Sequence, residues 1–122
     1  MKKKRIVVVE DNETNMYLIN FILEKNDYEV IKAPSGEEAI ELVAKEKPDL
    51  VIMDIDLPGI DGLETTRRIR QSEADGNIPI VALTSYAMTG DREKALDAGC
   101  TGYIEKPINP EAFMSQIEEY LK

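Results

Sequence analysis

The stretch LVIMDIDLPG, at residues 50–59, decides the fold of this 122-residue chain. Four apolar residues lead directly to Asp54, and a turn that contains Pro58 and Gly59 follows. An apolar run without polar alternation is typical of a strand that is buried on both faces, as in a parallel sheet. The stretch therefore predicts a buried strand that holds the carboxylate of Asp54 at its carboxyl end.

Similar apolar segments alternate with helical patterns along the whole chain. We predict strands near residues 5–9, 28–32, 49–53, 80–84 and 101–104. We predict helices near residues 13–25, 35–45, 62–72 and 91–98, and a fifth that begins at residues 109–110. Right-handed crossovers would place the helices on both faces of a parallel sheet. The expected fold is an α/β, flavodoxin-like (βα)5 doubly wound sandwich with strand order 2-1-3-4-5.

Helix caps support these boundaries. Asn12 and Asn109 can cap the first and fifth helices, and proline follows Asn109 at the first helical position. Ser35 and Glu38 have the spacing of a capping box at the start of the second helix. Gly99 suits the end of the fourth helix.

Polar side chains lie at the carboxyl ends of four predicted strands. Besides Asp54, the pair Glu10 and Asp11 follows the first strand, Thr84 ends the fourth, and Lys106 follows the fifth. Ligands of open α/β sheets bind outside the carboxyl ends of the strands, so these residues should meet in one crevice. Clustered carboxylates suit a hard cation, and a nearby lysine suits phosphate.

Composition excludes several classes of protein. The chain has 24 acidic and 15 basic residues, a net charge of -9, and no basic stripe, so we expect no binding to nucleic acid. It has no histidine, which excludes a phosphohistidine donor, a Ser-His triad and a His-ligated zinc within the chain. The single cysteine, Cys100, is expected to be a small buried residue. No apolar run approaches the ~20 residues of a membrane span, and we expect a cytoplasmic protein.

Taken together, the motifs resemble the receiver domains of two-component response regulators. The matching stretches are VEDN at residues 9–12, MDIDLPG at 53–59, ALTS at 82–85 and KP at 106–107. The stretches EDNETNM at 10–16 and AMTGD at 87–91 are most similar to those of DivK-type single-domain regulators. Receivers at the end of hybrid histidine kinases have similar stretches. The resemblance implies one receiver domain over residues 1–122, without an output domain, that exists as a monomer or weak dimer.

The resemblance also implies that Asp54 accepts a phosphoryl group from a partner histidine kinase or histidine phosphotransferase. Asp11 and Asp54 would bind Mg²⁺ directly, together with the main-chain carbonyl of Asp56. Glu10 would act through a bound water. Crowded carboxylates raise each other's pKa unless a cation lies among them, and Mg²⁺ binds one or two carboxylates together with a phosphate.

Phosphoryl transfer depends on positioning and on neutralising charge. The resemblance implies that Lys106 and Thr84 contact the phosphoryl oxygens, and that the peptide bond between Lys106 and Pro107 is cis. Thr84 and Tyr103 would form a switch that repacks the face of helix 4, strand 5 and helix 5, where a downstream protein binds. Asp56 and Tyr86 are expected to tune the lifetime of the phosphoryl group.

Two other classes share part of the pattern. Asp54 and Asp56 resemble the Asp-x-Asp motif of haloacid-dehalogenase-type phosphatases, but those enzymes carry it on their first strand, and this length leaves no room for a cap or substrate pocket. A non-phosphorylated interaction domain with the same fold would usually lack the acceptor or the lysine. We therefore expect a signalling switch, not a conventional enzyme, whose only chemistry is its own phosphorylation and dephosphorylation.

Overall fold

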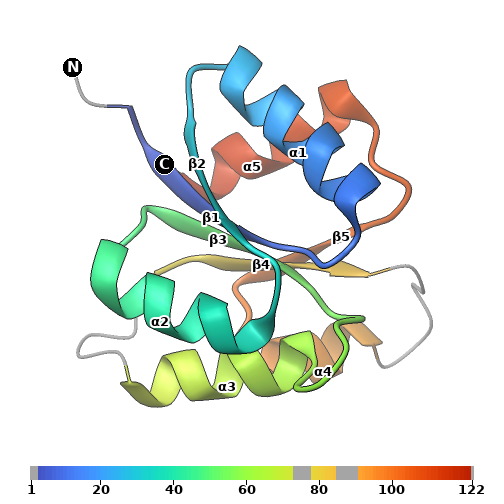
Figure 1. Cartoon of the computed structure of the whole chain (residues 1–122). Helices are drawn as coiled ribbons and strands as arrows, with labels where there is room; N and C mark the ends of the chain where they lie inside the picture. The colour runs from blue at the N-terminus through green and yellow to red at the C-terminus, as the bar shows by residue number, and fades with distance from the viewer. Residues whose placement is uncertain (1–2, 73–77, 85–90, 122) are drawn as a thin grey trace.

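The computed structural model describes residues 3–72, 78–84 and 91–121 (Figure 1). Within these residues, five parallel strands form one sheet in the order β2-β1-β3-β4-β5. The strands are β1 (Arg5–Val9), β2 (Glu29–Ala33), β3 (Leu50–Asp54), β4 (Ile80–Thr84) and β5 (Gly102–Glu105). The helices are α1 (Glu13–Lys25), α2 (Gly36–Glu46), α3 (Gly62–Ser72), α4 (Asp91–Ala98) and α5 (Pro110–Tyr120). The predicted fold class and strand order are confirmed, and every described boundary lies within one residue of its prediction.

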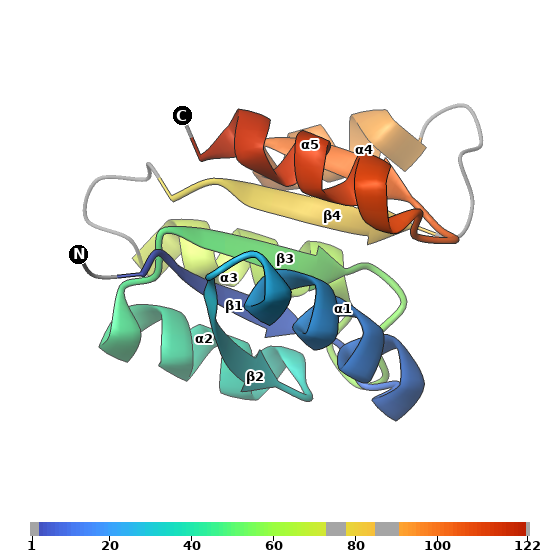
Figure 2. The ribbon, with the colours of Figure 1, turned by 90° about the horizontal axis from the view of Figure 1, so that it is seen from above.

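The helices form a layer on each face of the sheet. Helices α1 and α5 cover one face, and α2, α3 and α4 cover the other (Figure 1). Figure 2, seen from above, shows α1 and α5 lying in front of the strands. Among the described helices, none has the length and apolar character that a membrane crossing requires.

Strand β1 explains why the apolar runs lack polar alternation. Ile6 and Val8 pack into the cluster that contains residues of α1 and α5. Val7 and Val9 pack into the cluster that contains residues of α2, α3 and α4. All four side chains are fully buried, because successive residues of a strand point to opposite faces and both faces are covered.

The predicted helix caps are present. The side chain of Asn12 accepts a hydrogen bond from the Asn15 amide at 2.9 Å, and Ser35 accepts one from the Glu38 amide at 3.2 Å. Asn109 accepts from two amides in the first turn of α5. Gly99 follows α4 with a φ of 113°, a left-handed conformation that glycine adopts without strain.

The single cysteine is buried, as predicted. Cys100 precedes β5 and packs in the cluster beneath α2, α3 and α4. Burial raises the pKa of its thiol above the ordinary value. A buried thiol with a raised pKa is a packing residue and not an activated nucleophile.

Strand register brings the predicted functional residues to one edge of the sheet. Val9 pairs with Met53, so the residues that follow, Glu10 and Asp54, lie side by side at the strand ends. Asp54 itself pairs with Leu83, the residue before Thr84. The sheet therefore assembles its polar residues at the carboxyl ends of the strands, where a parallel α/β sheet binds ligands.

Candidate functional site

Three carboxylates meet at the carboxyl edge of the sheet. One oxygen from each of Glu10, Asp11 and Asp54 lies within 4.8 Å of the other two. Glu10 and Asp54 are each only 2% exposed, whereas Asp11 is exposed to solvent. Carboxylate oxygens with one side open to water are the donor set that Mg²⁺ favours, because this ion keeps several waters when it binds a protein. The residues present therefore fit a divalent cation.

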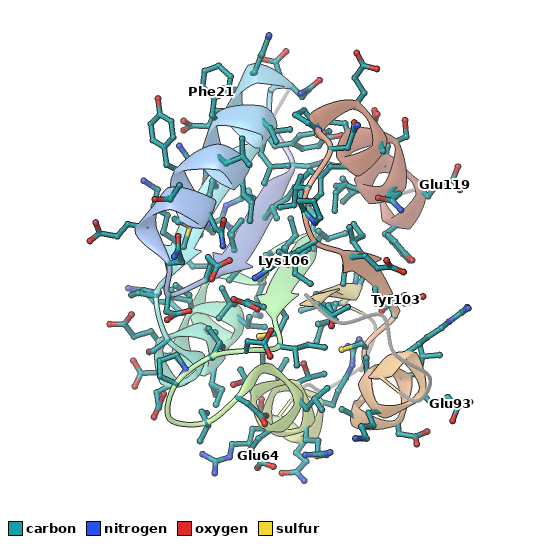
Figure 3. All side chains as sticks on the ribbon, turned by 90° about the vertical axis from the view of Figure 1, so that its right-hand side faces the viewer. Phe21, Glu64, Glu93, Tyr103, Lys106 and Glu119 are labelled. Atoms are coloured by element: carbon teal, nitrogen blue, oxygen red, sulfur yellow. The ribbon has the colours of Figure 1, made fainter. Side chains whose placement is uncertain are left out.

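Lys106 reaches the carboxylates from the end of β5. Its Nζ lies 3.2 Å from Asp54 Oδ1 and 3.5 Å from Glu10 Oε1, and its side chain is 16% exposed. Figure 3 looks onto this edge of the sheet and shows Lys106 near its centre. The peptide bond between Lys106 and Pro107 is cis, as predicted.

The charge of Lys106 is maintained by its neighbours. Burial alone would lower the pKa of the ammonium group, but the carboxylates of Asp54 and Glu10 outweigh this effect and raise the pKa. Lys106 is therefore a permanent cation at neutral pH. Its ammonium group lies where it would attract a further anion bound next to Asp54.

The ionised form of Glu10 is disfavoured in the folded site. Burial is the largest cause that raises its pKa to about 7, and the hydrogen bond and charge of Asp54 raise it further. Lys106 and the Asn12 amide, which donates to Glu10 Oε2 at 3.3 Å, offset only part of this effect. Three carboxylates thus face one ammonium group, and a divalent cation would neutralise the excess negative charge.

The backbone after β3 fixes the position of Asp54. The Asp56 amide donates to Asp54 Oδ1 at 3.0 Å, while the side chain of Asp56 points into solvent. Gly62, the first residue of α3, packs directly against this turn, because a Cβ at this position would lie 2.2 Å from the carbonyl oxygen of Asp54. Sequence reasoning did not identify Gly62 as part of the site. The available signal was a glycine at a helix start shortly after the acidic stretch.

The predicted switch residues lie on β4 and β5. Thr84 is buried at the end of β4, and its carbonyl oxygen accepts a hydrogen bond from the Lys106 amide at 2.8 Å. Tyr103 is half-buried on β5 and lies away from the carboxylates, on the side of Lys106 toward α4 (Figure 3). Tyr86 and most of the AMTGD stretch fall in residues 85–90, outside the described part of the chain.

The structure thus brings together four of the predicted site residues, Glu10, Asp11, Asp54 and Lys106. The acidic motif lies at the end of β3, the central strand of the sheet, and the other two carboxylates follow β1. This arrangement differs from the first-strand position of the motif in haloacid-dehalogenase-type phosphatases. Tyr103 takes no part in the carboxylate cluster, so any role in signalling must be indirect.

Comparisons with known proteins agree with this geometry. Residues 6–118 match the response regulator receiver domain family. The chain is 43% identical to the polar-differentiation response regulator DivK of Brucella ovis over 118 residues. The aligned residues cover 97% of this chain and 96% of that protein.

Two solved structures are similar over nearly the whole chain. The receiver domain of a sensor histidine kinase from Pseudomonas aeruginosa, with a magnesium ion coordinated in its active site cleft, has a TM-score of 0.90 and 34% identity over 98% of each chain. The receiver domain of a Saccharomyces cerevisiae response regulator, co-crystallised with a histidine phosphotransfer signalling protein, also has a TM-score of 0.90. It is 31% identical over 98% of this chain and 89% of that chain.

Proposed function

Because this chain belongs to the receiver-domain family of two-component response regulators, we propose that Asp54 is its phosphoryl acceptor and that Mg²⁺ binds beside it. Receiver domains are signalling switches and not conventional enzymes. The observation that carries the assignment is the position of Asp54, which is buried between the other two carboxylates and the ammonium group of Lys106. Glu10 has the same two kinds of neighbour, but its oxygen lies farther from the Lys106 ammonium group, at 3.5 Å against 3.2 Å for Asp54.

We assign the metal to the acidic cluster. Asp11 and Asp54 would hold Mg²⁺ directly, with the main-chain carbonyl of Asp56, and Glu10 would act through a bound water. When bound, the ion neutralises charge on the carboxylates and on the phosphoryl oxygens. The excess of negative charge in the cluster and the raised pKa of Glu10 support this assignment.

The transfer itself needs little covalent chemistry from the protein. A carboxylate oxygen of Asp54 forms a bond to phosphorus while the phosphorus–nitrogen bond of a donor phosphohistidine breaks. The electron pair of that bond stays on the donor imidazole, which takes up a proton. Lys106 neutralises a phosphoryl oxygen, and Thr84 donates its hydroxyl hydrogen to another. Water later cleaves the acyl phosphate, at a rate that Asp56 and Tyr86 tune.

The donor is a histidine kinase or a histidine phosphotransferase. These 122 residues contain no histidine, so the phosphohistidine must lie outside them, and we assign it to a partner protein. The yeast receiver domain that was crystallised with a histidine phosphotransfer protein supports such a partner. The net charge of -9 argues against direct output through nucleic acid.

The output is a protein contact on the face formed by α4, β5 and α5. Phosphorylation adds about 1.5 to 2 negative charges beside Lys106 and draws in Thr84. Tyr103 then turns inward, and the face repacks. Shifting such an equilibrium from 1:99 to 99:1 requires about 5.5 kcal/mol of differential stabilisation, which several charge-assisted contacts can supply.

Labelling with a small-molecule phosphodonor tests the proposal. Wild-type protein is incubated with acetyl phosphate and Mg²⁺, the acyl phosphate is reduced with borohydride, and the modified residue is located by mass spectrometry. We expect modification of Asp54, and its loss both in Asp54→Asn and in the presence of a chelator. Asp97→Asn makes the same chemical change on the exposed side of α4 and should be labelled like the wild type. Undiminished labelling of Asp54→Asn would refute the assignment.

A further inference from the structure

A cation lies over the ring of the switch tyrosine. The guanidinium carbon of Arg92 is 5.6 Å from the centroid of the Tyr103 ring. Arg92 belongs to the first turn of α4 and is exposed, whereas Tyr103 belongs to β5 and is half-buried. The contact therefore joins the helix and the strand that form most of the proposed output face.

The distance is within the range of about 6 Å in which a cation is attracted to an aromatic face. A guanidinium group is well suited to this contact because it is planar and weakly hydrated. The contact exists only while Tyr103 points toward α4. It therefore stabilises one position of the ring at the expense of any position that turns away from Arg92.

Among the described residues, Tyr103 has an apolar cluster and a groove as neighbours. The ring packs on one side against the cluster beneath α2, α3 and α4. It also borders a groove of about 430 Å³ that continues along β5 to Phe113 and Gln116 of α5. Among the described residues, Arg92 makes a cation–π contact with the ring, and this contact opposes movement of the ring away from α4.

We propose that Arg92 holds Tyr103 in its outward position and thereby sets the resting balance of the switch. This inference rests on the proposed function, in which Tyr103 turns inward after phosphorylation. In the resting state the guanidinium group covers the ring, and inward rotation of Tyr103 breaks that contact. Arg92 is thus a positioning residue that acts through Tyr103 and touches neither the metal nor the phosphoryl group.

Removing Arg92 should increase the affinity of the protein for the anion beryllofluoride. Beryllofluoride bound at Asp54 mimics the phosphoryl group and favours the inward state. The apparent affinity for beryllofluoride equals the intrinsic affinity multiplied by the fraction of protein that is already in the inward state. Removing Arg92 should raise that fraction and therefore tighten the binding of beryllofluoride. We expect a gain of about two- to five-fold, the range for a cation–π contact at an exposed site. Loss of a positive charge would by itself weaken the binding of an anion, so electrostatics alone predicts the opposite result.

The test is an NMR titration of the full chain with beryllofluoride in the presence of Mg²⁺. Arg92→Ala should bind more tightly than the wild type, and without beryllofluoride its Tyr103 ring signals should already lie closer to their bound positions. Lys94→Ala removes an exposed cation from the same helix and should bind no more tightly than the wild type. Arg92→Lys keeps the charge but loses the planar group, and should show a smaller gain. In a Tyr103→Leu background, Arg92→Ala should have no further effect.

Three results would overturn the inference. These are equal or weaker binding by Arg92→Ala, an equal gain in Lys94→Ala, and a gain that persists when Tyr103 is leucine. Each of them leaves the proposed function intact, provided that the wild type responds to beryllofluoride. A wild type that shows no Mg²⁺-dependent response would instead refute the proposed function, and the inference with it.

Discussion

Replacing Glu10 with glutamine should remove a pH-dependent loss of stability from the metal-free protein. Glu10 is buried beside Asp54, and its pKa is raised from the ordinary value of 4.5 to about 7. Below pH 4.5 the group is protonated in both the folded and the unfolded chain. Between pH 4.5 and 7 the unfolded chain ionises first, so the folded state binds more protons and becomes less stable as the pH rises.

The size of the effect follows from the shift. One pKa unit corresponds to about 1.4 kcal/mol, so the free energy of unfolding should fall by up to about 3 kcal/mol across this window. Glutamine has a similar shape and carries no charge. Glu10→Gln should therefore be about as stable as the wild type at pH 4 and more stable at pH 8, by up to about 3 kcal/mol.

Urea denaturation with a chelator present, at several pH values, measures the difference between the two proteins. Glu41→Gln neutralises an exposed carboxylate on α2 and should follow the wild-type pH profile closely. Adding Mg²⁺ at pH 8 should recover stability in the wild type, because the ion binds only the folded acidic cluster. Parallel pH profiles for the wild type and Glu10→Gln would refute the view that the ionised form of Glu10 is disfavoured in the folded site.

Three further substitutions test separate parts of the account. Lys106→Ala should bind Mg²⁺ as tightly as the wild type or more tightly in calorimetry, because a competing cation is lost. The same variant should show a weaker NMR response to beryllofluoride. A large loss of Mg²⁺ affinity would show that the lysine is misplaced. Gly62→Ala should destabilise the fold by about 1 to 3 kcal/mol in urea, because its Cβ would lie 2.2 Å from the Asp54 carbonyl oxygen, and wild-type stability would contradict that close approach. Asn109→Ala should cost about 1 kcal/mol through the lost cap of α5, whereas its Mg²⁺ affinity should match that of the wild type; a change in that affinity would link the cap to the site.

The fold was predictable because both the strands and the helix caps leave local signals. The apolar run before Asp54 and the cap residues Asn12, Ser35 and Asn109 each indicate an element without reference to distant residues. The boundaries of β2, β3 and β5 shifted by one residue, because the ends of a strand depend on hydrogen bonds to its neighbours in the sheet. Parallel strands end at one edge, and this rule was sufficient to group the acids with the lysine.

The contacts that the sequence did not reveal are those between separate helices and strands. Nothing local to Arg92 indicates that its guanidinium group lies over Tyr103, since the contact depends on how α4 packs beside β5. The close approach of Gly62 to Asp54 likewise requires the path of the turn before α3. The sequence indicated that repulsion between the carboxylates would raise the pKa of Glu10. Burial is the largest cause of the raised pKa, and it becomes visible only in the folded chain.

The most direct test of the central claim is to observe the acyl phosphate itself. Phosphorus NMR of the protein in acetyl phosphate and Mg²⁺ should show a new acyl phosphate resonance. The resonance should disappear when a chelator is added, and it should be absent from Asp54→Asn. A wild-type protein without this resonance, or an Asp54→Asn variant that retains it, would contradict the claim that Asp54 accepts a phosphoryl group with the help of Mg²⁺.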